Sequence, residues 1–357
     1  MTPNSTVRHR RLASLAAMML GACVALAQGP NNSGTYYKPA DGKSGKSLKT
    51  AMAEVIVDHS AISYSGLWKC FYTTDRRSDG KVWDMYSSAT NYTMGGPQQG
   101  ANYKKEGDSY NREHSMPKSW FNDARPMYTD LVHIVPTDGY VNNRRGNYPF
   151  GETNGEQYQS AGGFSKLGRS TTSGYSGTVF EPADEYKGDF ARIYFYMVTC
   201  YEKRVATWQS DMLDGTAYPA LSRWALDLLL RWAKEDPVSQ KETERNEAVW
   251  ELQGNRNPFV DYPGLEQYVW GDKTAVAFSY DHYDSDGPSA ITEAYGVRLY
   301  HRGHNGAPRR RQGRRPAGPS KGHIHNKQRQ QGRHGEINSQ VRPHEAPPTT
   351  GSNTRQQ

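Results

Sequence analysis

The stretch YNREHSMPKSWF, residues 110–121, places Arg112, Glu113 and His114 side by side ahead of a Trp-Phe pair. A carboxylate is a ligand for hard metal ions, and a neutral imidazole can accept a proton from water near neutral pH. A lone Glu-His pair is also typical of a solvated strand end. Residues elsewhere in the chain therefore have to distinguish a catalytic pair from a surface loop.

A second stretch, YTDLVHIVPTDGYVNNRRGNYPFGE, occupies residues 128–152. Its segment DLVHIVP alternates like a strand, and we expect Pro136 to end that strand. Thr137 or Asp138 can then cap a short helix, DGYVNNRRGN. The two stretches together predict a strand that carries the Glu-His pair, a loop, a second strand and a helix rich in Asn and Arg.

The side chains of this predicted arrangement suit one kind of chemistry. Carboxylate and amide oxygens, as in Glu113 and Asn142, favour Mg²⁺ over zinc. A histidine can act as the base, and arginines neutralise phosphate and leaving-group charge. These are the components of metal-assisted phosphodiester hydrolysis. The body lacks HExxH or paired cysteine ligands, so a zinc hydrolase is poorly supported.

The two stretches resemble the bacterial endonuclease I family of periplasmic or secreted nucleases. The resemblance continues in order through GTVFEPADEYKGDFARIYFYM, WALDLLL, DPVSQKETERNEAV and NRNPFVDYPGLEQYVWG, and covers roughly residues 50–272. It implies an α+β fold, with a His-Me finger (ββα-metal) core surrounded by helices and long loops. It also implies hydrolysis of DNA and RNA.

The resemblance assigns roles to residues that match the family pattern. His114 matches the general base that activates water, and Glu113 and Asn142 match the two protein ligands of a single Mg²⁺. Mn²⁺ or Ca²⁺ can replace that ion in binding. An arginine of the loop after the histidine strand lies near the phosphate in the family, and Arg125 is the one arginine in that loop here.

Further residues extend the predicted site. The phosphate contacts that we expect are Arg144, Arg145 and Asn147, although a solvated helix face would account for the two arginines equally well. Some family members have a histidine where Val132 stands, which leaves a supporting role to His133. The alternating strand pattern predicts that His133 is a packed, hydrogen-bonded core residue.

The first 27 residues read as a signal peptide. Three arginines precede the apolar run LASLAAMMLGACVALA, and a small-x-small cleavage site ends at Ala27. Export to the periplasm or the medium follows. A lipoprotein cleavage box with Cys23 lipidated ranks second, because apolar sequence continues beyond it. After cleavage only Cys70 and Cys200 remain, and a disulfide and two free thiols both stay open.

The net charge of +7 is unevenly distributed. Residues 296–357 contain 13 Lys or Arg against 2 acidic residues, which leaves 31 basic and 35 acidic residues in 1–295. The basic charge belongs to a tail of Arg, Gly, Gln, Pro and His, which we expect to be disordered. A frameshift or a degraded C-terminal module would also produce so abrupt a change in composition.

Between signal and tail we expect a flexible leader at 28–47 and a catalytic domain at 48–285. Apolar spacing and capping signals predict helices at 48–59, 185–204, 218–236 and 237–254. Pro237 suits a helix start and Gly254 suits a stop. No internal stretch has the roughly 18 apolar residues of a membrane span.

The sequence thus predicts a secreted, Mg²⁺-dependent endonuclease that cleaves DNA and RNA without sequence preference. We expect it to be a monomer without a stable protein partner. One alternative is a nucleic-acid-binding protein with weak or no catalysis, held to its ligand by the basic tail. Another is a metal-dependent phosphodiesterase that acts on small substrates.

Overall fold

The structure, a computed structural model, describes residues 28–283. These residues belong to the first of the two units into which the chain divides, 1–298 and 299–357. The predicted signal peptide with Cys23 and the predicted tail at 296–357 lie outside the described residues. No helix between residues 28 and 283 is long and apolar enough to cross a membrane.

Two strands and one helix form the part of the fold that the sequence predicts most directly. Strand β1 (Tyr110–His114) pairs antiparallel with β2 (Ile134–Asp138), and α3 (Gly139–Arg145) follows β2 without a break. The Asp138 side chain caps α3 by accepting from the backbone N–H of Val141 at 2.8 Å. The predicted order of strand, loop, strand and helix is confirmed.

The expected end of β2 is wrong. Pro136 lies inside the strand, opposite Arg112 of β1, and β2 continues to Asp138. Proline lacks a backbone donor, and it is tolerated where one side of a strand is free of a neighbour. The β1–β2 sheet has two strands, so each strand has such a side.

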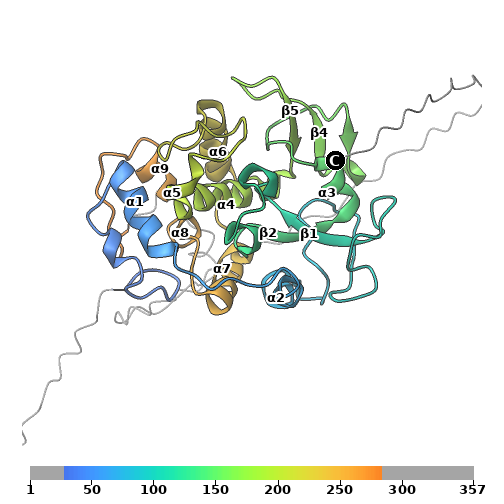
Figure 1. Ribbon diagram of the computed structural model, residues 1–357, viewed down its shortest axis with the longest axis horizontal. Coiled ribbons are helices and arrows are strands. Elements are labelled where there is room, and N and C mark those ends of the chain that lie inside the picture. The colour runs from blue at the N-terminus through green and yellow to red at the C-terminus, as the bar shows by residue number, and fades with distance from the viewer. Residues whose placement is uncertain (1–27, 284–357) are drawn as a thin grey trace, which may run out of the picture. The chain divides into compact units, whose positions relative to one another are not determined.

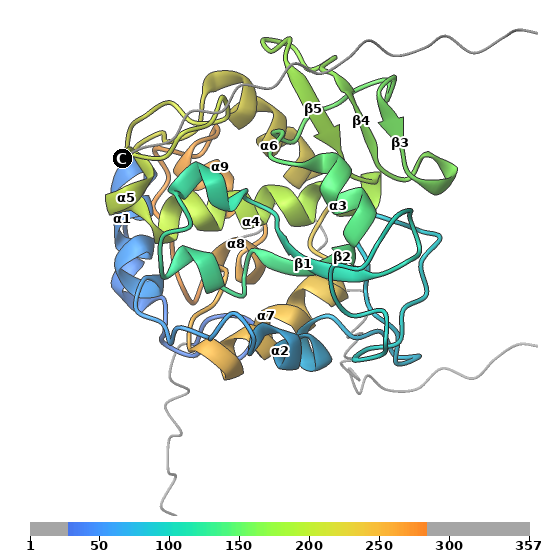
Figure 2. The ribbon, with the colours of Figure 1, turned by 45° about the vertical axis from the view of Figure 1, so that its right-hand side comes forward.

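A second, three-stranded antiparallel sheet has the order β3 (Tyr158–Gln159), β4 (Lys166–Arg169) and β5 (Thr178–Glu181). Figure 2 shows α3 between this sheet and the β1–β2 pair. A bridge between Phe150 and Phe180 joins the chain after α3 to β5. The α+β class is therefore confirmed, and the named strands of the described residues form two small sheets.

Helix α4 (Lys187–Cys200) is the centre of the helical part, and every residue of it after Lys187 is buried. It packs against α6 (Arg223–Glu235) and α1 (Gly45–Ile56), while α7 (Gln240–Gln253) packs against α2 (Leu67–Thr74), as Figure 1 shows. The shorter helices are α5 (Glu202–Val205), α8 (Pro258–Asp261) and α9 (Leu265–Val269). Single 3₁₀ turns occur at Lys38–Ala40, Lys118–Phe121, Met127–Thr129, Ala161–Gly163 and Asp184–Tyr186.

The predicted helices are present, with shifted starts. Gly254 ends α7 in the left-handed conformation, with φ of 84°, as its position predicts. The start is set by Ser239, whose hydroxyl and Glu242 form a capping box, and not by Pro237. Likewise Ser44 caps α1, which begins at Gly45, three residues before the expected 48–59 helix.

Residues 28–47 do not form the flexible leader that their composition predicts. Tyr37 and Ala40 are fully buried, and the Tyr37 hydroxyl donates to Asp261 at 2.6 Å. The Tyr37 ring also makes an edge contact with Tyr262. Tyr37 thus anchors this Gly- and Ser-rich segment to the domain, together with the backbone hydrogen bonds between Gly42, Lys43 and Phe278.

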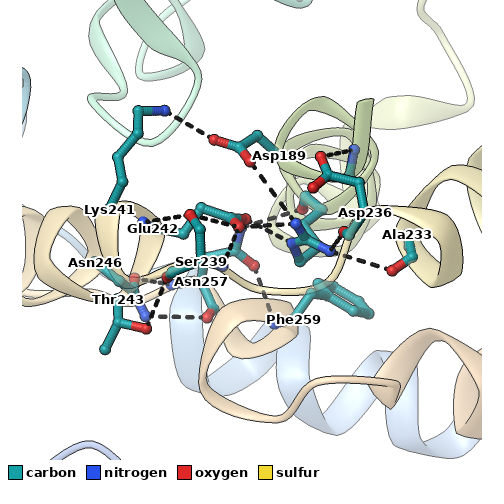
Figure 3. Close-up of polar contacts among 12 residues, drawn as sticks. Asp189, Ala233, Asp236, Ser239, Lys241, Glu242, Thr243, Asn246, Asn257 and Phe259 are labelled. Atoms are coloured by element: carbon teal, nitrogen blue, oxygen red, sulfur yellow. Dashed lines mark hydrogen bonds and ion pairs between the residues drawn. The ribbon is translucent and has the colours of Figure 1, made fainter. Parts of the chain in front are cut away.

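A buried ion network joins α4, α6, α7 and α8 (Figure 3). Arg192 of α4 forms a two-bond pair with Glu242 of α7, at 2.5 and 2.8 Å, and donates to the Asp236 carbonyl at 2.8 Å. Lys241 reaches Asp189 at 2.8 Å. Arg192, Glu242, Lys241 and Asp189 thus each have an opposite charge beside them, and the network ties α4 to α7 and to the residue that follows α6.

Candidate active site

Helix α3 is fastened to β1 by two pairs of side chains. Asn111 and Glu113 are two residues apart on β1 and therefore share one face of the strand. Asn142 donates its amide N–H to Asn111 Oδ1 at 2.8 Å, and Arg145 forms an ion pair with Glu113 Oε1. Asn142 and Arg145 are three residues apart on α3 and so share the face that meets the strand.

Arg145 lies in the interior and has no exposed side-chain surface. Besides Glu113, its guanidinium donates to the carbonyls of His114 at 3.1 Å and Ser115 at 2.7 Å, and to the Tyr194 hydroxyl at 3.3 Å. The predicted contact between Arg145 and a phosphate therefore finds no support in this geometry. The side chain instead fixes the end of β1, where the Glu-His pair lies.

Glu113 is also buried, and its second partner is the Tyr86 hydroxyl, which donates to Oε1 at 2.8 Å. Burial raises the pKa of the Glu113 carboxyl, while Arg145 and Tyr86 oppose that rise. Both side-chain hydrogen bonds reach Oε1, so Oε2 takes part in neither.

The donors around Glu113 fit a hard cation. Because Asn142 uses its N–H toward Asn111, its amide oxygen is left as an acceptor. The Glu113 carboxylate and this amide oxygen come from facing elements, β1 and α3. Oxygen donors of this kind are those that Mg²⁺ takes from proteins.

His114 points to the opposite face of β1, into a group of aromatic rings. The centroid of its ring is 5.2 Å from that of Tyr128, 5.6 Å from that of His133 and 6.1 Å from that of Tyr64. Its Nε2 lies 3.1 Å from the Tyr128 carbonyl oxygen. A carbonyl can only accept, so Nε2 carries the proton and Nδ1 carries the lone pair.

Burial lowers the pKa of His114 to about 3. The imidazole is therefore neutral at physiological pH, with its Nδ1 lone pair unprotonated. His133 is fully buried and meets the Met127 carbonyl oxygen through Nε2 at 2.7 Å, as the prediction of a packed, hydrogen-bonded histidine requires. Its ring lies beside that of His114 and limits the orientations open to it.

Cations surround Tyr128, whose carbonyl orients His114. The guanidinium carbon of Arg125 is 5.5 Å from the centre of the Tyr128 ring, and the Lys118 ammonium is 5.6 Å from it. Arg125 is exposed, and Lys118 is paired with Asp123. The structure thus brings Arg125 to the side of the histidine, and it adds Lys118.

The other predicted phosphate contacts lie around the end of α3. Arg144 is exposed, with its guanidinium carbon 5.0 Å from the centre of the Tyr158 ring. Asn147 is exposed and lines a pocket that Trp120 and Tyr148 also line. Arg144 and Asn147 can therefore meet a polymer from solvent.

Sequence reasoning missed the aromatic support of the histidine. Arg112 shares the His114 face of β1 and lies between two rings, 3.6 Å from the centre of Tyr64 and 4.4 Å from that of Trp68. It also donates to the Tyr64 carbonyl at 2.6 Å. Alternate residues of a strand share a face, so the sequence NREH predicts that Arg112 lies on the same face as His114. No local pattern indicates which aromatic residues enclose Arg112.

A second group of side chains that could bind a metal ion consists of His59, Asp130 and Cys200. One nitrogen of His59, one oxygen of Asp130 and the sulfur of Cys200 lie within 4.8 Å of one another, and could hold a metal ion. The Asp130 carboxylate already accepts from Tyr196, Tyr201, Gln253 and the Val132 backbone. Within the described residues, Cys70 and Cys200 are both free and buried, so neither forms a disulfide.

Comparison with known proteins gives consistent matches. The family described as endonuclease I matches residues 44–264. An extracellular ribonuclease of Bacillus amyloliquefaciens is 37% identical over 245 residues, 66% of this chain and 78% of that protein. A Bacillus subtilis protein with the same name is 36% identical over 242 residues, with the same coverage. A periplasmic deoxyribonuclease of Aeromonas hydrophila is 29% identical over 135 residues, 38% of this chain and 48% of that protein.

Proposed function

The chain belongs to the endonuclease I family, and from that premise we propose that it is an exported, Mg²⁺-dependent endonuclease that cleaves DNA and RNA without sequence preference. As a member of that family it is a nucleic-acid-cleaving hydrolase. The β1–β2–α3 unit is, in this proposal, a His-Me finger with His114 as general base. The relatives named ribonuclease and deoxyribonuclease support both substrates.

The orientation of His114 is the observation that supports this mechanism most. Because the Tyr128 carbonyl accepts the Nε2 proton, the lone pair on Nδ1 is fixed in one direction. A neutral imidazole in a fixed orientation can take a proton from an attacking water. The His114 ring is restricted by the neighbouring rings of Tyr64, Tyr128 and His133. The imidazole therefore has little rotational freedom left to lose when the water is positioned.

Glu113 and Asn142 would hold one Mg²⁺ through the carboxylate and the amide oxygen. When bound, that ion would stabilise negative charge on the phosphate and the leaving oxygen. Arg145 keeps Glu113 in place from the buried side, and Asn111 keeps Asn142 in place. The chain thus holds both donors by contacts that do not depend on substrate.

Arg125, Lys118, Arg144 and Asn147 would contact the phosphates of the polymer. Their charged or polar groups lie on both sides of the β1–α3 unit, near Tyr128 and at the end of α3. Contacts with phosphates carry no sequence information, so cleavage would not depend on sequence. Acidic residues outnumber basic ones in residues 1–295, 35 to 31, which fits a local and not a general polyanion surface.

Export is proposed from the N-terminal pattern of the sequence and from the names of the relatives, which are extracellular or periplasmic. We propose that the mature chain starts after Ala27, without a lipid at Cys23, and acts as a monomer.

The test is plasmid cleavage by the purified protein with Mg²⁺ and with EDTA. We expect nicking that needs the metal and that is lost or strongly weakened in Glu113→Gln and Asn142→Ala. His59→Ala is the matched control, because it alters the second donor group and leaves β1 and α3 intact. Dependence on His59 with indifference to Glu113 would move the metal to the second group. Cleavage of nucleotide-sized esters with no effect of polymer length would favour the small-substrate phosphodiesterase.

A further inference from the structure

An open pocket of about 350 Å³ lies next to the end of α3. Two of its walls belong to segments that also build the site: Trp120 lies six residues after His114, and Asn147 and Tyr148 follow α3 directly. The third wall is formed by Tyr175, Ser210 and Asp211. Its volume falls in the roughly 300–1,000 Å³ range of small-ligand pockets.

The wall around Asp211 is held in place by several contacts. The Tyr175 hydroxyl donates to Asp211 Oδ2 at 2.7 Å, and the Tyr175 ring stacks on Trp224, with centroids 4.3 Å apart and planes 9° apart. The Trp224 indole N–H and the Ser222 hydroxyl fix the Asp211 carbonyl at 3.0 and 2.9 Å. Asp211 Oδ1 accepts no hydrogen bond from the described residues, and it remains available to a ligand.

The lining of the pocket indicates the chemistry of its ligand. It contains no lysine or arginine, and the Asp211 carboxylate would repel a phosphate from its side of the pocket. Three aromatic residues line it, and Tyr148 is 43% exposed. Aromatic surface beside a hydrogen-bond acceptor suits a flat, neutral group that carries an amino substituent. On the polymer that this enzyme would cleave, that group is a nucleobase.

We propose that this pocket binds the base of a nucleotide that flanks the scissile phosphate, with Tyr148 as the stacking surface and Asp211 as the acceptor for the amino group of the base. The inference rests on the proposed function, since it takes a nucleic acid as substrate. Cytosine, adenine and guanine present an amino group, and uracil and thymine do not. The proposed absence of sequence preference would thus hold at every position but one, at which the enzyme would prefer an unpaired, amino-bearing base.

The experiment measures binding in EDTA and cleavage in Mg²⁺, with a single-stranded oligothymidylate that carries one cytidine at each position in turn. For wild-type protein we expect one position at which cytidine tightens binding and lowers KM, and at which an abasic site weakens both. Tyr148→Ala should weaken binding at that position by about five- to 150-fold, as loss of base–aromatic stacking does. Asp211→Asn should keep the stacking effect and lose the preference for cytidine over thymidine.

Tyr72→Ala is the matched control, because Tyr72 is an equally exposed tyrosine (46%) on α2, away from the pocket lining. It should leave the positional profile unchanged. A flat wild-type profile, or a profile that survives both Tyr148→Ala and Asp211→Asn, would overturn the proposal. Binding in EDTA does not need turnover, so a positional profile without cleavage would preserve the pocket while refuting the proposed nuclease mechanism.

Discussion

Replacement of Arg145 by alanine should destabilise the protein far more than the same change at its neighbour Arg144. In Arg145→Ala, four acceptors each lose the hydrogen bond from Arg145, and Glu113 keeps its buried carboxylate without a cation. Loss of one partner from a buried ion pair costs about 3–5 kcal/mol. Arg144 is exposed and forms no ion pair with a described residue, so Arg144→Ala should change the free energy of unfolding by about 0.5 kcal/mol or less.

Thermal unfolding followed by circular dichroism measures the difference. For a domain of this size, the expected loss in Arg145→Ala lowers Tm by roughly 6–20 °C, and Arg144→Ala leaves it nearly unchanged. Cleavage should fall in both variants for different reasons: Arg145→Ala would lose the geometry of β1, while Arg144→Ala would lose a phosphate contact and show it as a raised KM.

A second substitution separates the lost hydrogen bonds from the unpaired charge. If the unpaired carboxylate dominates, Arg145→Ala with Glu113→Gln should be more stable than Arg145→Ala alone, with a coupling of about 0.5–3 kcal/mol. Equal Tm values for Arg145→Ala and wild type would refute the reasoning, because a fully buried guanidinium with four partners could not then be structural. If the changes that the two substitutions cause in the free energy of unfolding simply add, the unpaired Glu113 charge does not contribute to the loss of stability.

Three further predictions concern other parts of the molecule. Burial lowers the pKa of His114 to about 3, so the protonated, inactive imidazole forms only well below its usual pKa of 6.5. The pH–rate profile should therefore show no half-inactivation near pH 6.5. A fall in rate centred at that pH, in protein shown to be folded, would contradict the burial argument. Gly254→Ala forces alanine to φ of 84° at the end of α7 and should cost about 1 kcal/mol in urea unfolding, whereas an unchanged midpoint would mean that the helix end adapts. Asp130→Ala leaves the hydroxyls of Tyr196 and Tyr201 without their acceptor and should cost at least about 2 kcal/mol by the same assay; a loss below 0.5 kcal/mol would show that the network reorganises.

Local signals in the sequence were sufficient for the elements that carry the site. Asp138 as a cap predicts where α3 begins, and the Glu-His pair lies at the end of the predicted strand. These features depend on neighbours a few residues away. Pro136 misled the prediction because the limit that proline places on a strand depends on how many strands flank it, which is a property of the sheet.

The difference between Arg144 and Arg145 could not be read locally. Both are in the last turn of one helix, and the packing of α3 against β1 decides which arginine faces the interior. The same holds for Tyr37, whose partner Asp261 is 224 residues away. Sequence patterns predict the face of an element, whereas the partner of that face follows from packing across the whole domain.

Chemical rescue of a His114→Gly variant shows whether a neutral, oriented imidazole at this position removes the proton from the attacking water. The account predicts that the variant stays folded by circular dichroism, loses plasmid cleavage in Mg²⁺, and regains part of it when imidazole is added, while a Glu113→Gln variant gains nothing. Wild-type cleavage by His114→Gly without imidazole would contradict the account, because the base would then lie elsewhere.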